Sequence, residues 1–317
     1  MSDQSGCLIF AHRGGNKEAG GIADDCMDAG GTTSWMGEVE QRREQLPRAM
    51  HGAIADDCMD AGGTTPRMEE VEQRREQLPR AMHGAIAENT CAAFNYALQY
   101  PIDGIETDVQ LSLDEVPVLW HDWQLEKLGH PGKCIDDFNF AELEQMDFAG
   151  YNSPDALPEG ALSLQAFIDS YRGRCSLDIE LKSRDGESQQ RLESKILQML
   201  AIIGTSAADG VFISSYSLPG LIFAHRHAPD LPLYYLLSGH HTQADIERLL
   251  TDYSFLAGFC LPIDIHNEFI AKLLREQGKG VGVYTCNNKE EIQKALDLKV
   301  NILITDYPKL ALQLRDS

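Results

Sequence analysis

The chain has 317 residues, 43% of them hydrophobic and 24% charged, so it can bury the core of one large domain. Its formal net charge of −22 argues against a nucleic-acid partner and against docking on anionic membranes, because both select basic surfaces. The sequence has no long apolar run and no signal-peptide pattern at its start, so we expect a cytoplasmic protein without stable membrane insertion. Its eight cysteines form no CxxC pairs and are expected to be reduced thiols. The number of subunits stays open.

Short apolar segments alternate with helical segments outside residues 21–84, which predicts a parallel α/β fold. The candidate strands are residues 7–11, 103–109, 116–120, 175–181, 210–214, 232–237, 255–260, 280–285 and 301–305. The candidate helices lie near residues 90–99, 140–147, 163–171, 188–203, 217–227, 243–251, 267–277 and 289–298. The strand list is one longer than a (β/α)8 barrel needs.

A near-perfect repeat follows the first candidate strand, because residues 22–52 recur at 54–84 with a period of 32. Two copies this alike indicate an insertion or a duplication rather than a solenoid, which needs three or more repeats. Thr65 and Pro66 are suited to begin a helix in the second copy. The acidic loop at Asp24 matches no calcium-binding pattern. We therefore expect one barrel domain over residues 1–317, interrupted by an insertion at about 21–84, which costs little closure entropy.

The extra strand is explained by a hairpin over residues 104–121. Between Asp108 and Val116 there is no room for the helix that a parallel crossover requires. A turn near Asp114 and Glu115 would place Asp108 roughly opposite His121. Eight parallel strands then remain, as in a (β/α)8 TIM barrel. A doubly wound sheet is the alternative.

Carboxylates gather at the carboxyl ends of the predicted strands, the end where such barrels place their active sites. Glu106 and Asp108 stand two residues apart on one strand, so both side chains point to the same face. Glu180 and Lys182 repeat this geometry on a later strand. Three carboxylates from two strands need a cation to share a site. Oxygen ligands suit Mg²⁺ better than Zn²⁺, with Ca²⁺ or Mn²⁺ as further options.

Two histidines and two further cationic groups complete the candidate site. Arg13 and Lys182 supply positive charge for a bound phosphate, and His12 and His121 titrate near neutral pH, as proton transfer requires. Each residue alone has a structural explanation: a histidine at a strand end is more often structural, and Glu180 could simply pair with Lys182. Their joint order and placement at strand ends indicates a catalytic site.

This ordered set resembles the glycerophosphodiester phosphodiesterase family. The matching stretches are IFAHRGG (9–15), AENTCAAF (87–94), DGIETDVQLSLDEVPVLWHD (103–122), LDIELK (177–182), VFISSY (211–216) and LITDYP (303–308). The resemblance implies a (β/α)8 barrel that hydrolyses glycerophosphodiesters (deacylated phospholipids) to an alcohol and sn-glycerol 3-phosphate. It implies metal-ligand roles for Glu106, Asp108 and Glu180, acid and base roles for His12 and His121, and phosphate contacts for Arg13 and Lys182. Glu88 is expected at the mouth of the site, where it would orient Arg13 or the metal shell.

The sequence departs from the family pattern in three places. The insertion separates His12 from Glu88, Glu115 stands where the family usually has a turn glycine, and Tyr284 and Cys286 stand where a Trp-Thr pair is common. None of these residues is an expected metal ligand.

Two other functions stay open. One is lysophospholipase D-like cleavage of lipid headgroups on the same scaffold, for which Tyr216, Leu218 and Phe259 would supply apolar surface. The other is a catalytically impaired binding barrel. In either case we expect a small-molecule ligand that carries a phosphodiester, and no nucleic acid.

Overall fold

A computed structural model of the chain describes residues 6–15, 17, 86–152, 156–206 and 210–317. The duplicated segment, with its predicted helix and acidic loops, lies outside these residues, as do Cys26 and Cys58. The six cysteines of the described part are free thiols. No helix in the described ranges is long and apolar enough to cross a membrane.

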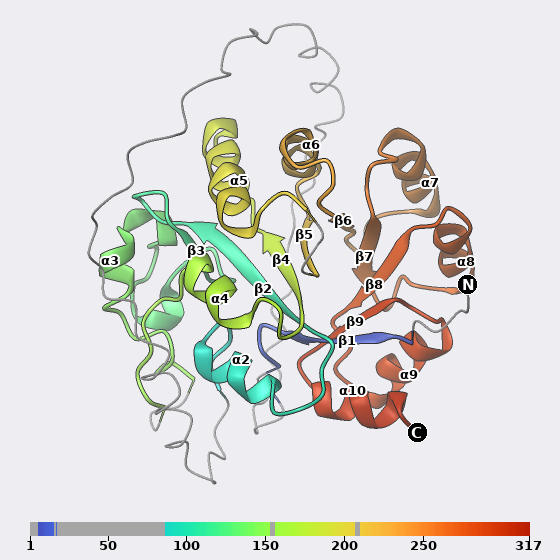
Figure 1. Cartoon of the computed structure of the whole chain (residues 1–317), viewed down its shortest axis with the longest axis horizontal. Coiled ribbons are helices and arrows are strands. Elements are labelled where there is room, and N and C mark those ends of the chain that lie inside the picture. Colours follow the sequence, from blue (N-terminus) through green and yellow to red (C-terminus); the bar gives the residue numbers. More distant parts are fainter. Residues whose placement is uncertain (1–5, 16, 18–85, 153–155, 207–209) are drawn as a thin grey trace, which may run out of the picture. The chain divides into compact units, whose positions relative to one another are not determined.

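The strands form one closed barrel. They are β1 (Leu8–His12), β2 (Gly104–Leu111), β3 (Pro117–Leu119), β4 (Ser176–Leu181), β5 (Val211–Ser215), β6 (Leu233–Leu236), β7 (Gly258–Pro262), β8 (Gly280–Tyr284) and β9 (Ile302–Thr305). All pair in parallel except β3, which runs antiparallel to β2. Because β1 pairs with both β9 and β2, the sheet closes on itself (Figure 1). The (β/α)8 barrel is therefore confirmed, and the doubly wound sheet, which would be open, is excluded.

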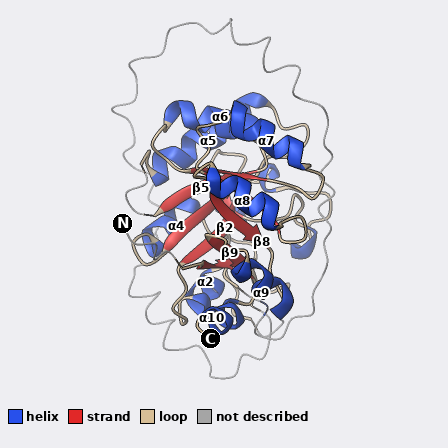
Figure 2. Ribbon diagram, turned by 90° about the vertical axis from the view of Figure 1, so that its right-hand side faces the viewer, coloured by secondary structure: helices blue, strands red, loops and turns tan. Residues whose placement is uncertain are grey.

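Helices surround this barrel: α2 (Cys91–Ala97), α3 (Phe140–Leu143), α4 (Leu164–Tyr171), α5 (Gln189–Ile203), α6 (Leu218–His227), α7 (Gln243–Asp252), α8 (Glu268–Glu276), α9 (Lys289–Asp297) and α10 (Pro308–Arg315). Figure 2 shows the strands between α5, α6 and α7 on one side and α2 and α10 on the other. Side-chain oxygens of Thr90, Ser163 and Ser188 cap α2, α4 and α5, which explains where these helices begin.

One predicted helix is shorter than expected, and one helix was missed. The helix expected over residues 140–147 is the single turn α3, which belongs to a small second core between β3 and α4. That core contains Trp120, Leu143 and Phe148. Helix α10 was not expected at all, although Pro308 at its first position is a typical helix start.

The hairpin forms as predicted, but its register differs by one residue. Val109 lies opposite Leu119, and the Trp120 N–H donates to the Asp108 carbonyl at 3.2 Å, so Trp120 and not His121 faces Asp108. The cause is the turn, which is centred on Asp114 rather than between Asp114 and Glu115.

The hairpin turn places a non-glycine residue in the left-handed region, because Glu115 has a φ of 63°. A side chain in this region costs about 1–2 kcal/mol. Replacement by glycine removes this cost, but glycine loses more conformational entropy on folding, which offsets part of the gain in stability. We expect Glu115→Gly to raise the free energy of unfolding by about 0.5–1 kcal/mol, measured by urea denaturation. Glu115→Ala keeps the Cβ atom and should give no such gain; an equal gain in both variants would contradict the backbone explanation.

Aromatic side chains fill the amino-terminal part of the barrel interior. Phe10 and Phe212 pack with Ile302 and Ile304 in one buried cluster. Glycine makes room for the rings, since a Cβ atom on Gly104 would lie 2.3 Å from the Phe10 ring. The barrel is therefore a packed core whose polar residues sit above an apolar floor, at the carboxyl ends of the strands.

Candidate active site

An acidic cluster lies inside the barrel on two neighbouring strands. The register of β2 and β4 sets Asp108 beside Glu180 and Glu106 beside Asp178. One carboxylate oxygen each of Glu106, Asp108 and Glu180 lies within 4.8 Å of the other two. That separation is about twice a Ca²⁺–oxygen distance, so a single cation between them is geometrically reasonable. The three expected ligands are thus brought together.

Two cations hold Asp108 from either side. The Arg13 Nε lies 3.1 Å from Asp108 Oδ2, and the Lys182 Nζ lies 3.4 Å from Asp108 Oδ1 and 3.1 Å from Glu180 Oε1. Burial would raise the pKa of Asp108, but Arg13 and Lys182 lower it well below its usual range, so this carboxylate stays ionised.

Glu106 behaves in the opposite way. Burial and the neighbouring Asp108 charge raise the pKa of Glu106 well above its ordinary value, and Arg13 offsets only part of this. Without a bound cation, burial and the neighbouring negative charge therefore oppose ionisation of Glu106. This negative charge is what a divalent ion would neutralise, so the donor set fits a hard cation.

A strained turn brings Arg13 back over the cluster. Arg13, Gly14 and Gly15 all have positive φ, and the Arg13 N–H donates to Glu106 Oε2 at 3.1 Å. The two glycines also permit close packing, since a Cβ atom on Gly14 would lie 2.6 Å from the Ala93 Cβ and one on Gly15 would lie 2.8 Å from Pro308. Backbone strain of this kind is typical of functional sites.

The segment before α2 adds one expected and one unexpected contact. Glu88 Oε2 accepts from the Arg13 guanidinium at 3.2 Å, so Glu88 and Arg13 are in contact. Asn89 was missed: its Nδ2 donates to Asp108 Oδ2 at 2.9 Å, while its Oδ1 accepts from Thr107 at 2.7 Å. Asn89 has a φ of 56°, in the left-handed region that asparagine tolerates better than most non-glycine residues, so the residue type fits this position.

His12 contacts the cluster with one nitrogen and a second carboxylate with the other. Its Nε2 lies 3.9 Å from Glu106 Oε2, and its Nδ1 lies 2.6 Å from Asp306 Oδ1. Asp306 belongs to the LITDYP stretch but received no role from the sequence. It directly follows β9, which pairs with β1, and this pairing is what brings it to His12.

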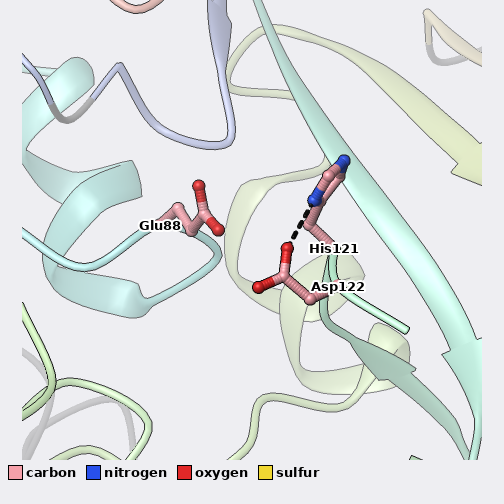
Figure 3. A group of neighbouring side chains, drawn as sticks. All are labelled: Glu88, His121 and Asp122. Atoms are coloured by element: carbon pink, nitrogen blue, oxygen red, sulfur yellow. Dashed lines mark hydrogen bonds and ion pairs between the residues drawn. The ribbon is translucent and has the colours of Figure 1, made fainter. Parts of the chain in front are cut away.

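His121 is paired with a carboxylate in a similar way. Its Nδ1 is 2.8 Å from Asp122 Oδ1, and Figure 3 shows the Glu88 carboxylate facing this pair. His121 is near enough to Asp108 to contribute to lowering the pKa of that carboxyl group. The Lys127 ammonium bridges Asp122 at 2.9 Å and Glu88 at 3.3 Å. Although Glu88, His121 and Asp122 also have ligand atoms within 4.8 Å of one another, the two carboxylates of this group are already paired with Lys127 and Arg13.

The apolar surface expected near the mouth is smaller than predicted. Phe259 is fully buried, so its proposed contribution is wrong, and Leu218 is only partly exposed. Tyr216 is exposed, and its hydroxyl donates to the Tyr284 hydroxyl at 2.8 Å. Trp123 was missed: the residue is 38% exposed, and the centre of its ring lies 5.4 Å from the Lys182 Nζ.

Asp178 lies beside Glu106, and its burial has a measurable consequence for the metal-free protein. Burial raises the pKa of Asp178 to about 8; Ser214 opposes the shift, whereas Glu180 and Asp108 add to it. Because the folded-state pKa exceeds the unfolded value, the stability that this group contributes is fully present below pH 4 and is lost as the pH rises toward 8.

We therefore expect the free energy of unfolding in chelator to fall over this range by up to about 1.4 kcal/mol per pH unit from this group. Asp178→Asn should remove that part of the slope, as measured by denaturant titrations at several pH values. An identical slope in the variant and the wild type would contradict the assignment to Asp178.

Comparison with known proteins agrees with this geometry. The model of the glycerophosphoryl diester phosphodiesterase family matches residues 80–310. A glycerophosphodiester phosphodiesterase of Bacillus subtilis is 27% identical over 240 residues, which cover 70% of this chain and 80% of the relative. A phosphodiesterase from Oleispira antarctica, solved in complex with the product sn-glycerol-3-phosphate, is 25% identical with a TM-score of 0.65, over 73% of this chain and 92% of that one. A Silicibacter pomeroyi structure, 22% identical over 73% of this chain and 89% of its own, has the same fold with a TM-score of 0.65.

The closed barrel and the family match together identify the chain as an enzyme of the phosphoric diester hydrolase class. More narrowly, the chain belongs to the glycerophosphoryl diester phosphodiesterase family. The family match begins at residue 80, within the last few residues of the insertion. The structure adds β1 from before the insertion, and with it His12 and Arg13.

Proposed function

We propose that this chain hydrolyses glycerophosphodiesters to an alcohol and sn-glycerol 3-phosphate, with Mg²⁺ as the divalent cation held by Glu106, Asp108 and Glu180. The observation that carries the proposal is the convergence of these three carboxylates next to Arg13 and Lys182. The product named for the Oleispira antarctica phosphodiesterase supports the choice of substrate.

Cationic side chains of the chain itself would bind the phosphodiester. Arg13 and Lys182 would bind the phosphodiester oxygens and stabilise the charge that grows as phosphorus becomes pentacoordinate. The bound cation would add Lewis-acid stabilisation of the same charge. Glu88 keeps Arg13 in place through its ion pair, so we expect it to affect substrate binding more than proton transfer.

The two histidines would move protons in both halves of the reaction. One takes the proton of the glycerol 2-hydroxyl, whose oxygen attacks phosphorus to form a cyclic phosphate. The other donates a proton to the oxygen of the departing alcohol. Water then opens the ring with the roles reversed, so each histidine returns to its starting state. His12 and His121 are the candidates, because each has one nitrogen paired with a carboxylate.

The deciding experiment measures release of sn-glycerol 3-phosphate from glycerophosphoethanolamine by the purified chain. We expect release with Mg²⁺ and none after a chelator has removed it, with recovery when Mg²⁺, Mn²⁺ or Ca²⁺ is returned. No release under any of these conditions, despite binding of the substrate, would support a binding barrel instead. Faster cleavage of the acylated analogue would favour the lipid headgroup reaction, for which the exposed Tyr216 and Trp123 are the remaining apolar surface.

We also propose that residues 21–84 are an insertion which the catalytic barrel does not need. Support comes from the family match, which begins at residue 80. In addition, the entropic cost of closing a loop grows only slowly with its length, so a barrel tolerates a long insertion. We expect a variant lacking 21–84 to keep its turnover within about twofold and its free energy of unfolding within about 1 kcal/mol. Loss of cooperative unfolding in this variant, measured by urea denaturation, would show that the segment belongs to the fold.

A further inference from the structure

We propose that Asp306 is a positioning residue that holds the His12 ring with its Nε2 nitrogen directed at the carboxylate cluster. This inference rests on the proposed function of His12, and it concerns a residue to which sequence comparison gave no role. It would make the imidazole of His12 ready to accept or donate a proton at one defined atom.

The geometry assigns a separate partner to each ring nitrogen of His12. Asp306 Oδ1 lies 2.6 Å from Nδ1, and Glu106 Oε2 lies 3.9 Å from Nε2. An ionised carboxylate only accepts hydrogen bonds, so the proton of a neutral imidazole is placed on Nδ1. The Nε2 lone pair then faces the site, where the reacting oxygen would be.

Asp306 is itself fixed in place. The side chain of Asp306 is 5% exposed, and its second oxygen, Oδ2, accepts from the Asn287 amide at 2.7 Å and pairs with the Lys17 ammonium at 3.2 Å. The Asp306 N–H donates back to Asn287 Oδ1 at 3.0 Å. Burial would raise the pKa of Asp306, but His12 and Lys17 lower it below its ordinary range, so the carboxylate remains an acceptor.

The strand register explains why these two residues meet although 294 positions separate them. Ala11 of β1 pairs with Thr305 of β9, so His12 and Asp306 are the next residues along two hydrogen-bonded strands. The equivalent partner of His121 is held less firmly, since Asp122 is 27% exposed and belongs to the same loop as His121. Asp306 is thus the more buried of the two carboxylates that pair with these histidines.

The test combines kinetics with NMR of the full chain, using Asp306→Asn. The amide keeps the shape of the carboxylate but can present an N–H to Nδ1, which favours the wrong tautomer. We expect kcat to fall about a hundredfold or more, while KM for glycerophosphoethanolamine and the affinity for Mg²⁺ change by less than about threefold. In ¹⁵N-histidine spectra of the wild type, the His12 signals, identified by their loss in His12→Ala, should show the proton on Nδ1.

A matched control is available at the other end of β1. Asp103 Oδ2 accepts from the Ile9 N–H at 2.8 Å and pairs with Arg315 at 2.6 Å, so Asp103→Asn also removes a carboxylate that anchors this strand. It should lower the unfolding temperature and leave kcat unchanged. A merely structural role for Asp306 predicts the same result for Asp306→Asn, and that outcome would overturn the proposal.

The two proposals fail in different ways. An inactive wild type would reject the proposed function, whereas an active Asp306→Asn variant would reject only the positioning role. Should the variant not fold, the wild-type spectrum still decides: a His12 proton on Nε2 with Nδ1 unprotonated would contradict the inference.

Discussion

Replacing either His12 or His121 with alanine should lower turnover by about a hundredfold or more, because each removes one of the two groups proposed to transfer protons. The measurement is kcat for release of sn-glycerol 3-phosphate at saturating Mg²⁺. Affinity for Mg²⁺ should change little, since neither ring is an expected ligand of the cation. His227→Ala is the control: this residue ends α6, is exposed and should be dispensable. Nearly full activity in both site variants would reject the assignment.

A substrate with a better leaving group separates the two roles. With a p-nitrophenyl ester of glycerol phosphate, the departing phenolate needs no proton, so the variant that lacks the general acid should recover much of its rate of p-nitrophenolate release in the first turnover. The variant that lacks the general base should remain slow, because the glycerol hydroxyl must still lose its proton. Equal rates for the two variants on both substrates would show that the histidines do not have separate roles as general acid and general base.

Glu180→Gln should weaken Mg²⁺ binding by about a hundredfold or more, since even residues that only orient metal ligands often account for 10–100-fold. Activity at a fixed, low Mg²⁺ concentration should fall with it and recover partly at high Mg²⁺. The metal-free variant should not be less stable, because Lys182 keeps Asp108 as a partner at 3.4 Å and the cluster loses one repelling charge. Titration calorimetry gives the affinity, and thermal unfolding in chelator gives the stability.

Glu187→Gln provides the matched control for this experiment. Glu187 pairs with the buried Lys195 at 2.7 Å, as Glu180 pairs with Lys182, but it belongs to no candidate ligand group among the described residues. Breaking this pair should reduce stability and leave the Mg²⁺ affinity unchanged. If both variants lose Mg²⁺ affinity equally, the effect comes from general destabilisation and Glu180 is not a ligand.

Much of the barrel was predictable because its strands are short, apolar and separated by amphipathic helices. All the predicted strands are found, most within one or two residues of their predicted bounds, although β7 begins at Gly258 rather than 255. The hairpin was predictable from loop length alone, because no crossover helix fits between Asp108 and Val116. The register of the hairpin was not predictable, because it depends on whether Glu115 adopts a left-handed conformation. The sequence alone does not decide between that conformation and the alternative.

The candidate site was predictable to the extent that local spacing determines it. Glu106 and Asp108 had to share a face because strand side chains alternate, and the carboxyl ends of parallel strands had to meet at one end of the barrel. Asn89 and Trp123 were missed because their contacts depend on loop conformations. Phe259 was misplaced because an apolar residue on a barrel strand can face either the helices or the interior, and it is buried in the main core.

The sequence by itself determined the parallel α/β alternation, the identity of the charged residues and their grouping by strand, because these follow from periodicity over a few neighbouring positions. The tertiary structure decided which partners those residues have. The pairing of His12 with Asp306 and of Arg13 with Glu88 and Asp108 joins segments far apart in the chain. Such contacts exist only once β1 has closed the barrel between β2 and β9, and no local pattern encodes that closure residue by residue.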